Sequence, residues 1–120
     1  MAKRVRTTLP KERLSPSEWE IMRICWRLGR CTVREVLEED LKKRKRDYRT
    51  ILTFMTRMAR KGWLATTKRG NQNLYEPAVL EALAGEHEIE RFFGEVVGKE
   101  PETLELVERA LSRRRAGLNG

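Results

Sequence analysis

The chain has 120 residues and a formal net charge of +8 at pH 7. This length predicts a single domain with a modest core and room for a short appendage. The excess of cations favours an anionic partner, nucleic acid first and an acidic membrane surface second. No apolar run approaches the roughly 18 residues of a membrane-spanning helix, and the basic N-terminus lacks the apolar region of a secretory signal. We therefore expect a cytoplasmic protein with free thiols at Cys25 and Cys31.

The charge is unevenly distributed along the sequence. Residues 41–61 hold nine cations against one anion, which gives a local net charge of +8. Residues 80–112 hold nine glutamates against three cations, which gives −6. Because phosphate would attract the first region and repel the second, we expect only the first region to face a polyanion.

The N-terminal part of the chain predicts a basic arm followed by a helix. Residues 1–13 carry five cations and little to bury, which is typical of a flexible arm or of a frayed terminus without a role. The motif Ser15-Pro16-Ser17-Glu18 combines an N-cap serine, a proline at the first helical position and a capping-box glutamate. A helix should follow to about Leu28 and end at Gly29. Its apolar arc comprises Trp19, Ile21, Met22, Cys25, Trp26 and Leu28.

A second capping box, Thr32-Val33-Arg34-Glu35, predicts a second helix that runs to about Leu41 or slightly further. Its apolar stripe comprises Val33, Val36, Leu37 and Leu41. The basic run Lys42–Arg46 then connects it to a third helix. This connection is longer than a helix-turn-helix normally has, which suggests that the second helix extends into the lysines.

The stretch Asp47–Lys61 has the period of an amphipathic helix, with Asp47 as a plausible N-cap. Its apolar half comprises Tyr48, Ile51, Leu52, Phe54, Met55, Met58 and Ala59. Its polar half contains only threonine, arginine and lysine, whereas an ordinary solvated face mixes both signs of charge. Such a face suits guanine edges and phosphates, although a basic solvated face remains the alternative. With the preceding arginine, the candidate DNA contacts of this recognition helix are Arg46, Arg49, Thr50, Thr53, Arg57, Arg60 and Lys61.

After Gly62, two short strands are predicted at Trp63–Lys68 and Gln72–Pro77, joined by a turn at Arg69–Asn71. Leu64, Leu74 and Thr66 should face the core. The candidate DNA contacts of this hairpin are Lys68, Arg69, Asn71, Gln72 and Asn73, although a solvated turn would have a similar composition.

These elements predict a mainly α fold with a small β-hairpin: a winged helix-turn-helix domain in residues 14–77, followed by helical dimerisation elements in residues 78–120. The last two helices are expected at Ala78–Val97, with a possible break at Gly85, and at Glu102–Arg114. Their apolar faces would be covered by a second copy of the chain or would pack back on the winged helix. The candidate dimerisation residues are Leu83, Ile89, Phe92, Phe93, Val96, Val97, Leu104, Val107 and Leu111.

Catalytic and metal-binding constellations are missing from the sequence. His87, Cys25 and Cys31 do not make a convincing four-ligand zinc set, and we find no nucleophile motif and no phosphate-binding loop. We therefore predict no enzyme, no cofactor, no metal and no small-molecule substrate. His87 is expected to be an exposed histidine, and a redox switch at Cys31 is a weaker hypothesis.

Several motifs resemble the penicillinase-repressor family, the BlaI/MecI type of winged-helix repressor. The first helix carries Leu14-Ser15-x-x-Glu18-Trp19-Glu20-x-Met22-x-x-x-Trp26, and the second carries Thr32-Val33-Arg34-Glu35-Val36. The third carries Thr50-Ile51-Leu52-Thr53 and Thr56-Arg57-Met58-x-x-Lys61-Gly62, and the hairpin carries Tyr75-x-Pro77. The resemblance covers about residues 14–97.

The resemblance implies a homodimer that binds a palindromic double-stranded DNA operator and represses transcription, with beta-lactamase-type resistance genes or related genes as targets. It places Arg49, Thr50 and Thr53 at groove-facing positions and Arg57 at a backbone-contacting position. Two departures bear on induction. The apolar segment that a sensor protease cleaves is missing after Phe92-Phe93-Gly94, and the cysteine cluster of copper-responsive relatives is missing after Cys31. The alternative function is a winged-helix module that binds an acidic protein or RNA without reading sequence.

Overall fold

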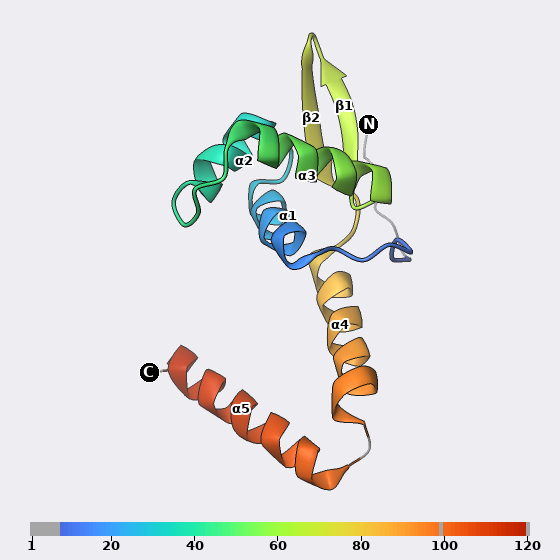
Figure 1. The fold of residues 1–120 in the computed structure, drawn as a ribbon, viewed down its shortest axis with the longest axis vertical. Coiled ribbons are helices and arrows are strands. Elements are labelled where there is room, and N and C mark those ends of the chain that lie inside the picture. The colour runs from blue at the N-terminus through green and yellow to red at the C-terminus, as the bar shows by residue number, and fades with distance from the viewer. Residues whose placement is uncertain (1–7, 99, 120) are drawn as a thin grey trace. The chain divides into compact units, whose positions relative to one another are not determined.

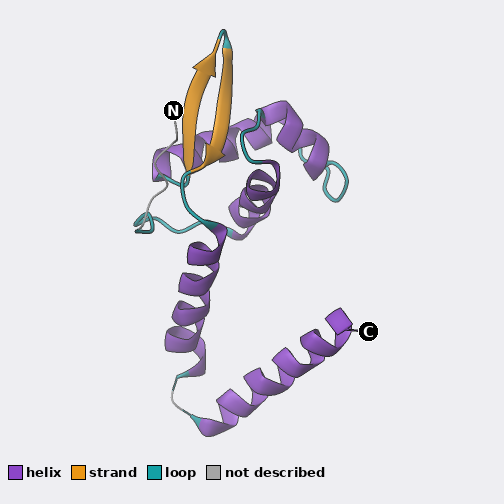
Figure 2. Ribbon diagram, turned by 180° about the vertical axis from the view of Figure 1, so that it is seen from behind, coloured by secondary structure: helices purple, strands orange, loops and turns teal. Residues whose placement is uncertain are grey.

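The computed structural model describes residues 8–98 and 100–119 (Figure 1). They form α1 (Pro16–Leu28), α2 (Val33–Asp40), α3 (Tyr48–Lys61), β1 (Leu64–Arg69), β2 (Gln72–Pro77), α4 (Glu81–Phe92), the π-helical turn η1 (Phe93–Val97) and α5 (Pro101–Asn119). The predicted fold class is confirmed, since a mainly helical chain carries one two-stranded hairpin and continues into C-terminal helices (Figure 2). The chain divides into two compact units after Ala84, seven residues beyond the predicted boundary.

The core of the N-terminal unit is built from one face of each of its three helices. Its fully buried side chains include Ile21, Met22 and Cys25 of α1, Val36 of α2, and Ile51, Met55 and Met58 of α3. These positions recur at the helical spacing expected from the sequence, so each helix turns one stripe inward. Leu28, at the end of α1, is 36% exposed and lies outside this core.

All three predicted helix starts are confirmed. In α1 the Glu18 amide donates to Ser15 Oγ and the Ser15 amide donates to Glu18 Oε1. Thr32 and Glu35 make the same reciprocal pair at α2. The Thr50 amide donates to Asp47 Oδ1 at 2.8 Å, which caps α3. Each cap satisfies backbone N–H groups that have no partner within the helix, so the three starts are fixed locally.

The prediction that α2 extends into the lysines is wrong. The helix ends at Asp40, and the chain turns because the amides of Lys43 and Arg44 both donate to the Asp40 carbonyl, at 3.0 and 2.8 Å. Leu41, expected on the apolar stripe, is 53% exposed beyond this end. The connection between α2 and α3 is therefore a true loop.

The hairpin, or wing, pairs in a register that runs from Leu64 opposite Pro77 to Arg69 opposite Gln72, which leaves a two-residue turn. Gly70 adopts a φ of +66°, a conformation that glycine enters without steric cost. Leu64 and Leu74 are buried as predicted, but Thr66 is exposed. The hairpin projects away from the helices (Figure 1), so the core covers only its base.

The base of the wing is joined to the residue that precedes the α2 cap. The Cys31 amide donates to the Tyr75 carbonyl and the Tyr75 amide donates to the Cys31 carbonyl, each at 2.8 Å. This bridge ties β2 to the helix-turn-helix, and no sequence motif indicated it.

The described part of the predicted arm is packed against the core. Pro10 is buried and Leu9 packs against core residues. The Trp63 indole N–H donates to the Glu12 carbonyl at 2.9 Å, which fixes this segment across the end of α3. The prediction of a flexible arm is therefore wrong for residues 9–13, while residues 1–7 lie outside the described residues.

The start of the C-terminal region also differs from the prediction. Val79, expected on a helix, precedes α4 and is buried in the N-terminal unit, where its carbonyl accepts the Trp26 indole N–H at 2.8 Å. The helix α4 continues through Gly85 without a break, and α5 extends past Arg114.

None of the described helices is long and apolar enough to cross a membrane.

Candidate nucleic-acid interface

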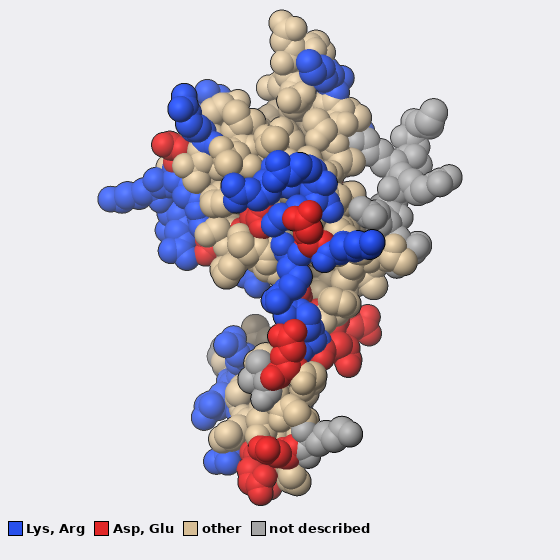
Figure 3. Space-filling model, turned by 45° about the vertical axis from the view of Figure 1, so that its right-hand side comes forward, with Lys and Arg blue, Asp and Glu red and all other residues tan. Residues whose placement is uncertain are grey.

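The outward face of α3 presents cations and hydroxyls to solvent. Burial of its apolar stripe turns the opposite face outward, and its exposed polar residues are Arg49, Thr53, Thr56, Arg57 and Arg60. Thr50 is half-buried. Figure 3 shows lysine and arginine side chains gathered over the N-terminal unit, with few acidic side chains among them.

The arginines of this face make no salt bridge within the part of the chain that the structure describes. Among the residues that the structure describes, Arg49, Arg57 and Arg60 form no ion pair with a carboxylate. Their guanidinium groups therefore keep the full charge and all the donors that phosphates and guanine edges require. A shallow depression of about 310 Å³ lies beside Arg57 and Arg60 and is lined also by Leu52, Thr53 and Thr56.

Arg46 occupies a different environment from these arginines. It precedes α3, and its side chain is only 16% exposed. One guanidinium nitrogen lies 2.6 Å from Asp40 Oδ1 and the other lies 2.6 Å from Glu20 Oε2. These pairs link the end of α2, the start of α3 and the middle of α1, so the placement of Arg46 does not support its prediction as a DNA contact.

Lys61 is likewise engaged inside the molecule. Its ammonium nitrogen lies 2.7 Å from Glu18 Oε1 and donates to the Arg13 carbonyl at 3.0 Å. The Glu18 side chain is 1% exposed and the Lys61 side chain is 12% exposed. Burial would raise the pKa of Glu18, but the hydrogen bonds from Lys61 and Ser15 outweigh it and the pKa is lowered. Lys61 thus holds α3 to α1, and its predicted role in DNA contact is not supported.

A second carboxyl group with a lowered pKa, that of Glu20, lies beside the loop between α2 and α3. Hydrogen bonds from Arg44 and then Arg46 lower the pKa of Glu20 to about 2. Arg44 lies 2.6 Å from Glu20 Oε1, and its Nε donates at 3.3 Å to Oε2, the oxygen that Arg46 also contacts. The basic run that precedes α3 is therefore partly neutralised by α1.

The wing places its predicted contacts together at its tip. All five predicted contacts are exposed, namely Lys68, Arg69, Asn71, Gln72 and Asn73. The two cations form no ion pair among the described residues, and the three amides carry donors and acceptors that suit a nucleic-acid backbone.

Comparison with known proteins identifies the family of the chain. Residues 14–116 match the family described as "Penicillinase repressor". The chain belongs to the penicillinase repressor family. This is a family of DNA-binding winged-helix transcriptional repressors, not of enzymes.

One curated relative matches most of this penicillinase repressor chain. An uncharacterized 16.5 kDa protein from the ptsI 3′ region of Latilactobacillus sakei is 38% identical over 94 residues, which are 76% of this chain and 63% of that protein. The chain thus spans less than two thirds of the length of this curated relative.

Solved structures show the same architecture. The DNA-binding domain of the repressor BlaI is 28% identical, with a TM-score of 0.54 over 64% of this chain and 92% of that one. Monomeric BlaI of Bacillus licheniformis, in complex with the blaP half-operator, is 30% identical, with a TM-score of 0.51 over 59% of this chain and 87% of that one. A MarR family protein from Bacillus stearothermophilus, 16% identical, shares the fold alone, with a TM-score of 0.50 over 91% and 78% of the two chains.

Three residues of this penicillinase repressor were not among the predicted site residues. Arg34, Tyr48 and Thr32 line an open hollow between α2, α3 and the wing. Tyr48 was assigned to the apolar half of its helix, but it is 44% exposed because it lies in the first turn, beyond the core. Only the two capping motifs could have drawn attention to this place, since they bring two helix starts close to the hairpin.

The two cysteines are part of the core of the repressor. Both are buried free thiols. A hydrogen bond to Cys31, together with burial, raises the pKa of Cys25 well above its ordinary value, and the same hydrogen bond lowers the pKa of Cys31. The predicted redox switch at Cys31 stays a prediction. Within the described part of the chain, no three metal-ligating side chains come together, and His87 is exposed.

Proposed function

We propose that the chain represses transcription by binding, as a homodimer, to a palindromic DNA operator. The observation that carries this proposal is the outward face of α3, where Arg49, Arg57 and Arg60 make no salt bridge to any described residue and lie beside threonine hydroxyls and a cationic wing. The BlaI protein of Bacillus licheniformis, which is similar to this chain, was solved on a half-operator. Such a repressor would act in the cytoplasm, on beta-lactamase-type resistance genes or related genes.

The positions along α3 divide the proposed contacts into two groups. Arg49, Thr50 and Thr53 lie in its first two turns, the part of a recognition helix that enters the major groove and meets base edges. Arg57 and Arg60 lie nearer the other end, where they would contact phosphates together with Lys68 and Arg69 of the wing. In this division, affinity comes mainly from the second group and sequence preference from the first.

The C-terminal unit supports dimerisation through its exposed apolar side chains. Ile89 and Phe92 of α4 are 58% and 46% exposed, and Leu104 and Leu111 of α5 are 39% and 53% exposed. Such large apolar groups at helical spacing are characteristic of a face that another chain covers. Leu83, Phe93 and Val107 are half-buried and would lie at its edge. Val97 is buried within its own chain and is no longer a candidate, and the side chain of Val96 lies outside the described residues.

The test is to capture genomic DNA with the tagged full chain and to extract the bound motif. We expect a palindrome with half-sites about one helical turn apart. The variants Arg49→Ala and Arg57→Ala are then titrated on that operator and on a scrambled duplex of equal length. Arg49→Ala should lose the preference for the operator by about 1–3 kcal/mol at one base pair, whereas Arg57→Ala should weaken both duplexes equally and reduce the salt slope by about 1.

The alternative function predicts a different result. A module that binds RNA or an acidic protein would recover no palindrome, and Arg49→Ala would then weaken binding to duplexes of any sequence by the same factor. For the dimer, Phe92→Glu should shift the sedimentation coefficient to that of a monomer, with Glu90→Ala as the exposed control on the same helix. A dimer that persists in Phe92→Glu would contradict the assignment of this face.

A further inference from the structure

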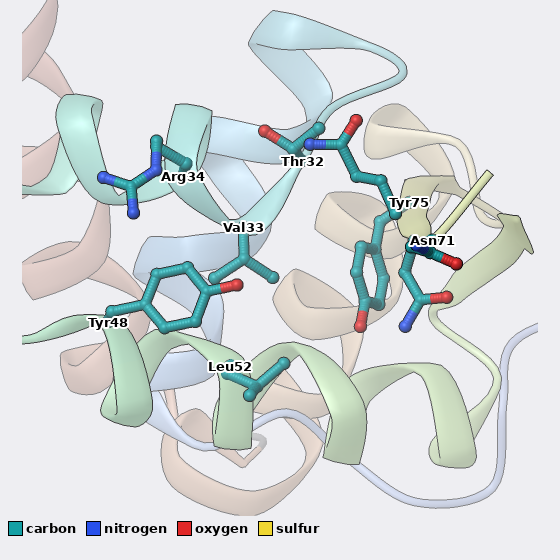
Figure 4. A pocket seen from close by; sticks show the side chains of 9 residues that line it. Thr32, Val33, Arg34, Tyr48, Leu52, Asn71 and Tyr75 are labelled. Carbon is teal, nitrogen blue, oxygen red and sulfur yellow. The ribbon is translucent and has the colours of Figure 1, made fainter. Parts of the chain in front are cut away.

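An open hollow of about 540 Å³ lies between the helix-turn-helix and the wing (Figure 4). Thr32 and Arg34 come from the start of α2, Tyr48 comes from the first turn of α3, and Asn71 and Tyr75 come from the wing. Figure 4 shows the Tyr48 and Tyr75 side chains reaching into it from opposite sides. The hollow lies beside the proposed base-reading face and is separate from it, since only Leu52 lines both it and the depression on α3.

The chemistry of the lining favours an anion. Arg34 is the only charged residue of the lining, and the polar remainder consists of hydroxyls and amides. Within the described residues, Arg34 forms no ion pair, and its guanidinium carbon lies 5.6 Å from the centroid of the Tyr48 ring. The neighbouring Glu35 does not neutralise it by contact, because that carboxylate accepts the Thr32 amide N–H at 2.9 Å.

The place of the hollow favours one kind of anion, the sugar-phosphate backbone of DNA. If α3 lies in the major groove and the wing reaches the adjacent minor groove, the strand between the two grooves must pass between α3 and the wing. The hollow occupies this interval. A backbone phosphate can accept hydrogen bonds from the arginine, hydroxyl and amide groups that line it.

We propose that this hollow seats a phosphodiester of the strand that separates the two grooves, with Arg34 as its cationic contact. Tyr48 holds the Arg34 guanidinium against its ring, which orients the arginine before DNA arrives. The proposal rests on the proposed function, because it assumes that α3 and the wing engage neighbouring grooves. It adds a contact from α2 to a site otherwise made by α3 and the wing.

The first measurement is the salt dependence of DNA binding by the full chain, with a mixed-sequence duplex as the probe. Removing one phosphate contact should lower affinity roughly tenfold near 0.1 M salt and reduce the slope of log K against log salt by about 0.9. We expect this of Arg34→Ala, while Arg34→Lys should keep the slope. The control is Arg23→Ala, which removes another exposed arginine, this one from α1 and away from the hollow, and should leave the slope unchanged. Equal slopes for Arg34→Ala and the unmodified protein would overturn the proposal.

The second measurement locates the phosphate. Operator duplexes ethylated at single phosphates are sorted into bound and free fractions by the unmodified protein and by Arg34→Ala. We expect one phosphate per half-site whose ethylation blocks the unmodified protein but has no further effect on Arg34→Ala. An identical interference pattern for both proteins would overturn the seat, and would leave a small anionic molecule as the occupant of the hollow.

The two levels of the proposal fail differently. If the unmodified protein does not distinguish operator from scrambled DNA, the proposed function itself fails. If it does distinguish them and Arg34→Ala behaves as the unmodified protein does, only the phosphate seat fails. Circular dichroism of each variant confirms that the helices are intact, which is expected because Arg34 is exposed.

Discussion

The loop between α2 and α3 and the outward face of α3 are both rich in cations, yet their cations are used in opposite ways. In the loop, Arg44 and Arg46 are paired with Glu20, and Arg46 also with the buried Asp40. On α3, Arg49 and Arg57 make no salt bridge among the described residues. Removing a cation from a buried carboxylate destabilises the fold, whereas an exposed cation without a salt bridge remains available to a ligand.

The same difference between paired and exposed cations occurs within α3. Its last residue, Lys61, forms a salt bridge with the buried Glu18, while Arg60 beside it is exposed and makes no salt bridge among residues 8–98 and 100–119. Two adjacent basic residues therefore differ in whether they serve the fold or the proposed interface. Four substitutions or conditions test this division, beginning with the one that should change stability most.

Lys61→Met should lower the free energy of unfolding by about 3–5 kcal/mol, because it leaves the Glu18 carboxylate buried without its cation. Urea denaturation followed by circular dichroism measures this change. The double variant Glu18→Gln, Lys61→Met should recover much of the loss, since glutamine can still accept the Ser15 amide N–H and needs no cation. Arg60→Ala is the exposed control and should stay within about 0.5 kcal/mol. A stable Lys61→Met variant with weak DNA binding would return Lys61 to the interface.

Arg46→Ala should lower the free energy of unfolding by about 3 kcal/mol, since the Asp40 carboxylate is nearly inaccessible to solvent. Hydrogen exchange should also quicken in the first turn of α3, because the loop before it loses its link to α1. Lys45→Ala, in the same loop and exposed, serves as the control. If both variants unfold at the same urea concentration, the network around Arg46 contributes nothing to stability.

Acid should destabilise the N-terminal unit in a defined range of pH. The folded-state pKa of Glu20 is about 2, below its ordinary value of 4.5, so the ionised form is favoured by folding. The contribution of Glu20 is complete above pH 4.5 and is lost as the pH falls from about 4.5 to about 2. The lowered pKa of Glu18 acts in the same direction. Urea midpoints measured across this range should fall less steeply in Glu20→Gln, and equal slopes would contradict the prediction.

Arg44→Ala should have the smallest effect, at most about 1 kcal/mol, because the Arg44 side chain is 58% exposed and exposed pairs contribute little. Thermal unfolding at low and high salt measures it, and the small difference from the unmodified protein should vanish at high salt. A loss as large as that of Arg46→Ala would show that exposure does not separate the two arginines.

Much of this fold is determined by interactions between residues that are close together in the sequence. Ser15 with Glu18, Thr32 with Glu35, and Asp47 with Thr50 each act over three residues, so the sequence alone places all three helix starts. The hairpin turn and the inward stripe of α3 are local in the same sense. The outward face of α3 followed directly, because the period that buries Met55 exposes Arg49 and Arg57.

Only the tertiary structure decided which cations serve the fold. Arg46 pairs with the Glu20 carboxylate, 26 residues away, and Lys61 pairs with that of Glu18, 43 residues away. The hydrophobic periodicity of the sequence does not predict such pairs. The same holds for the bridge between Cys31 and Tyr75 and for the hollow beside Arg34. These contacts depend on how separate helices and strands pack against one another. Composition therefore identified a basic region, whereas packing determined which of its arginines are held in salt bridges and which remain available to a ligand.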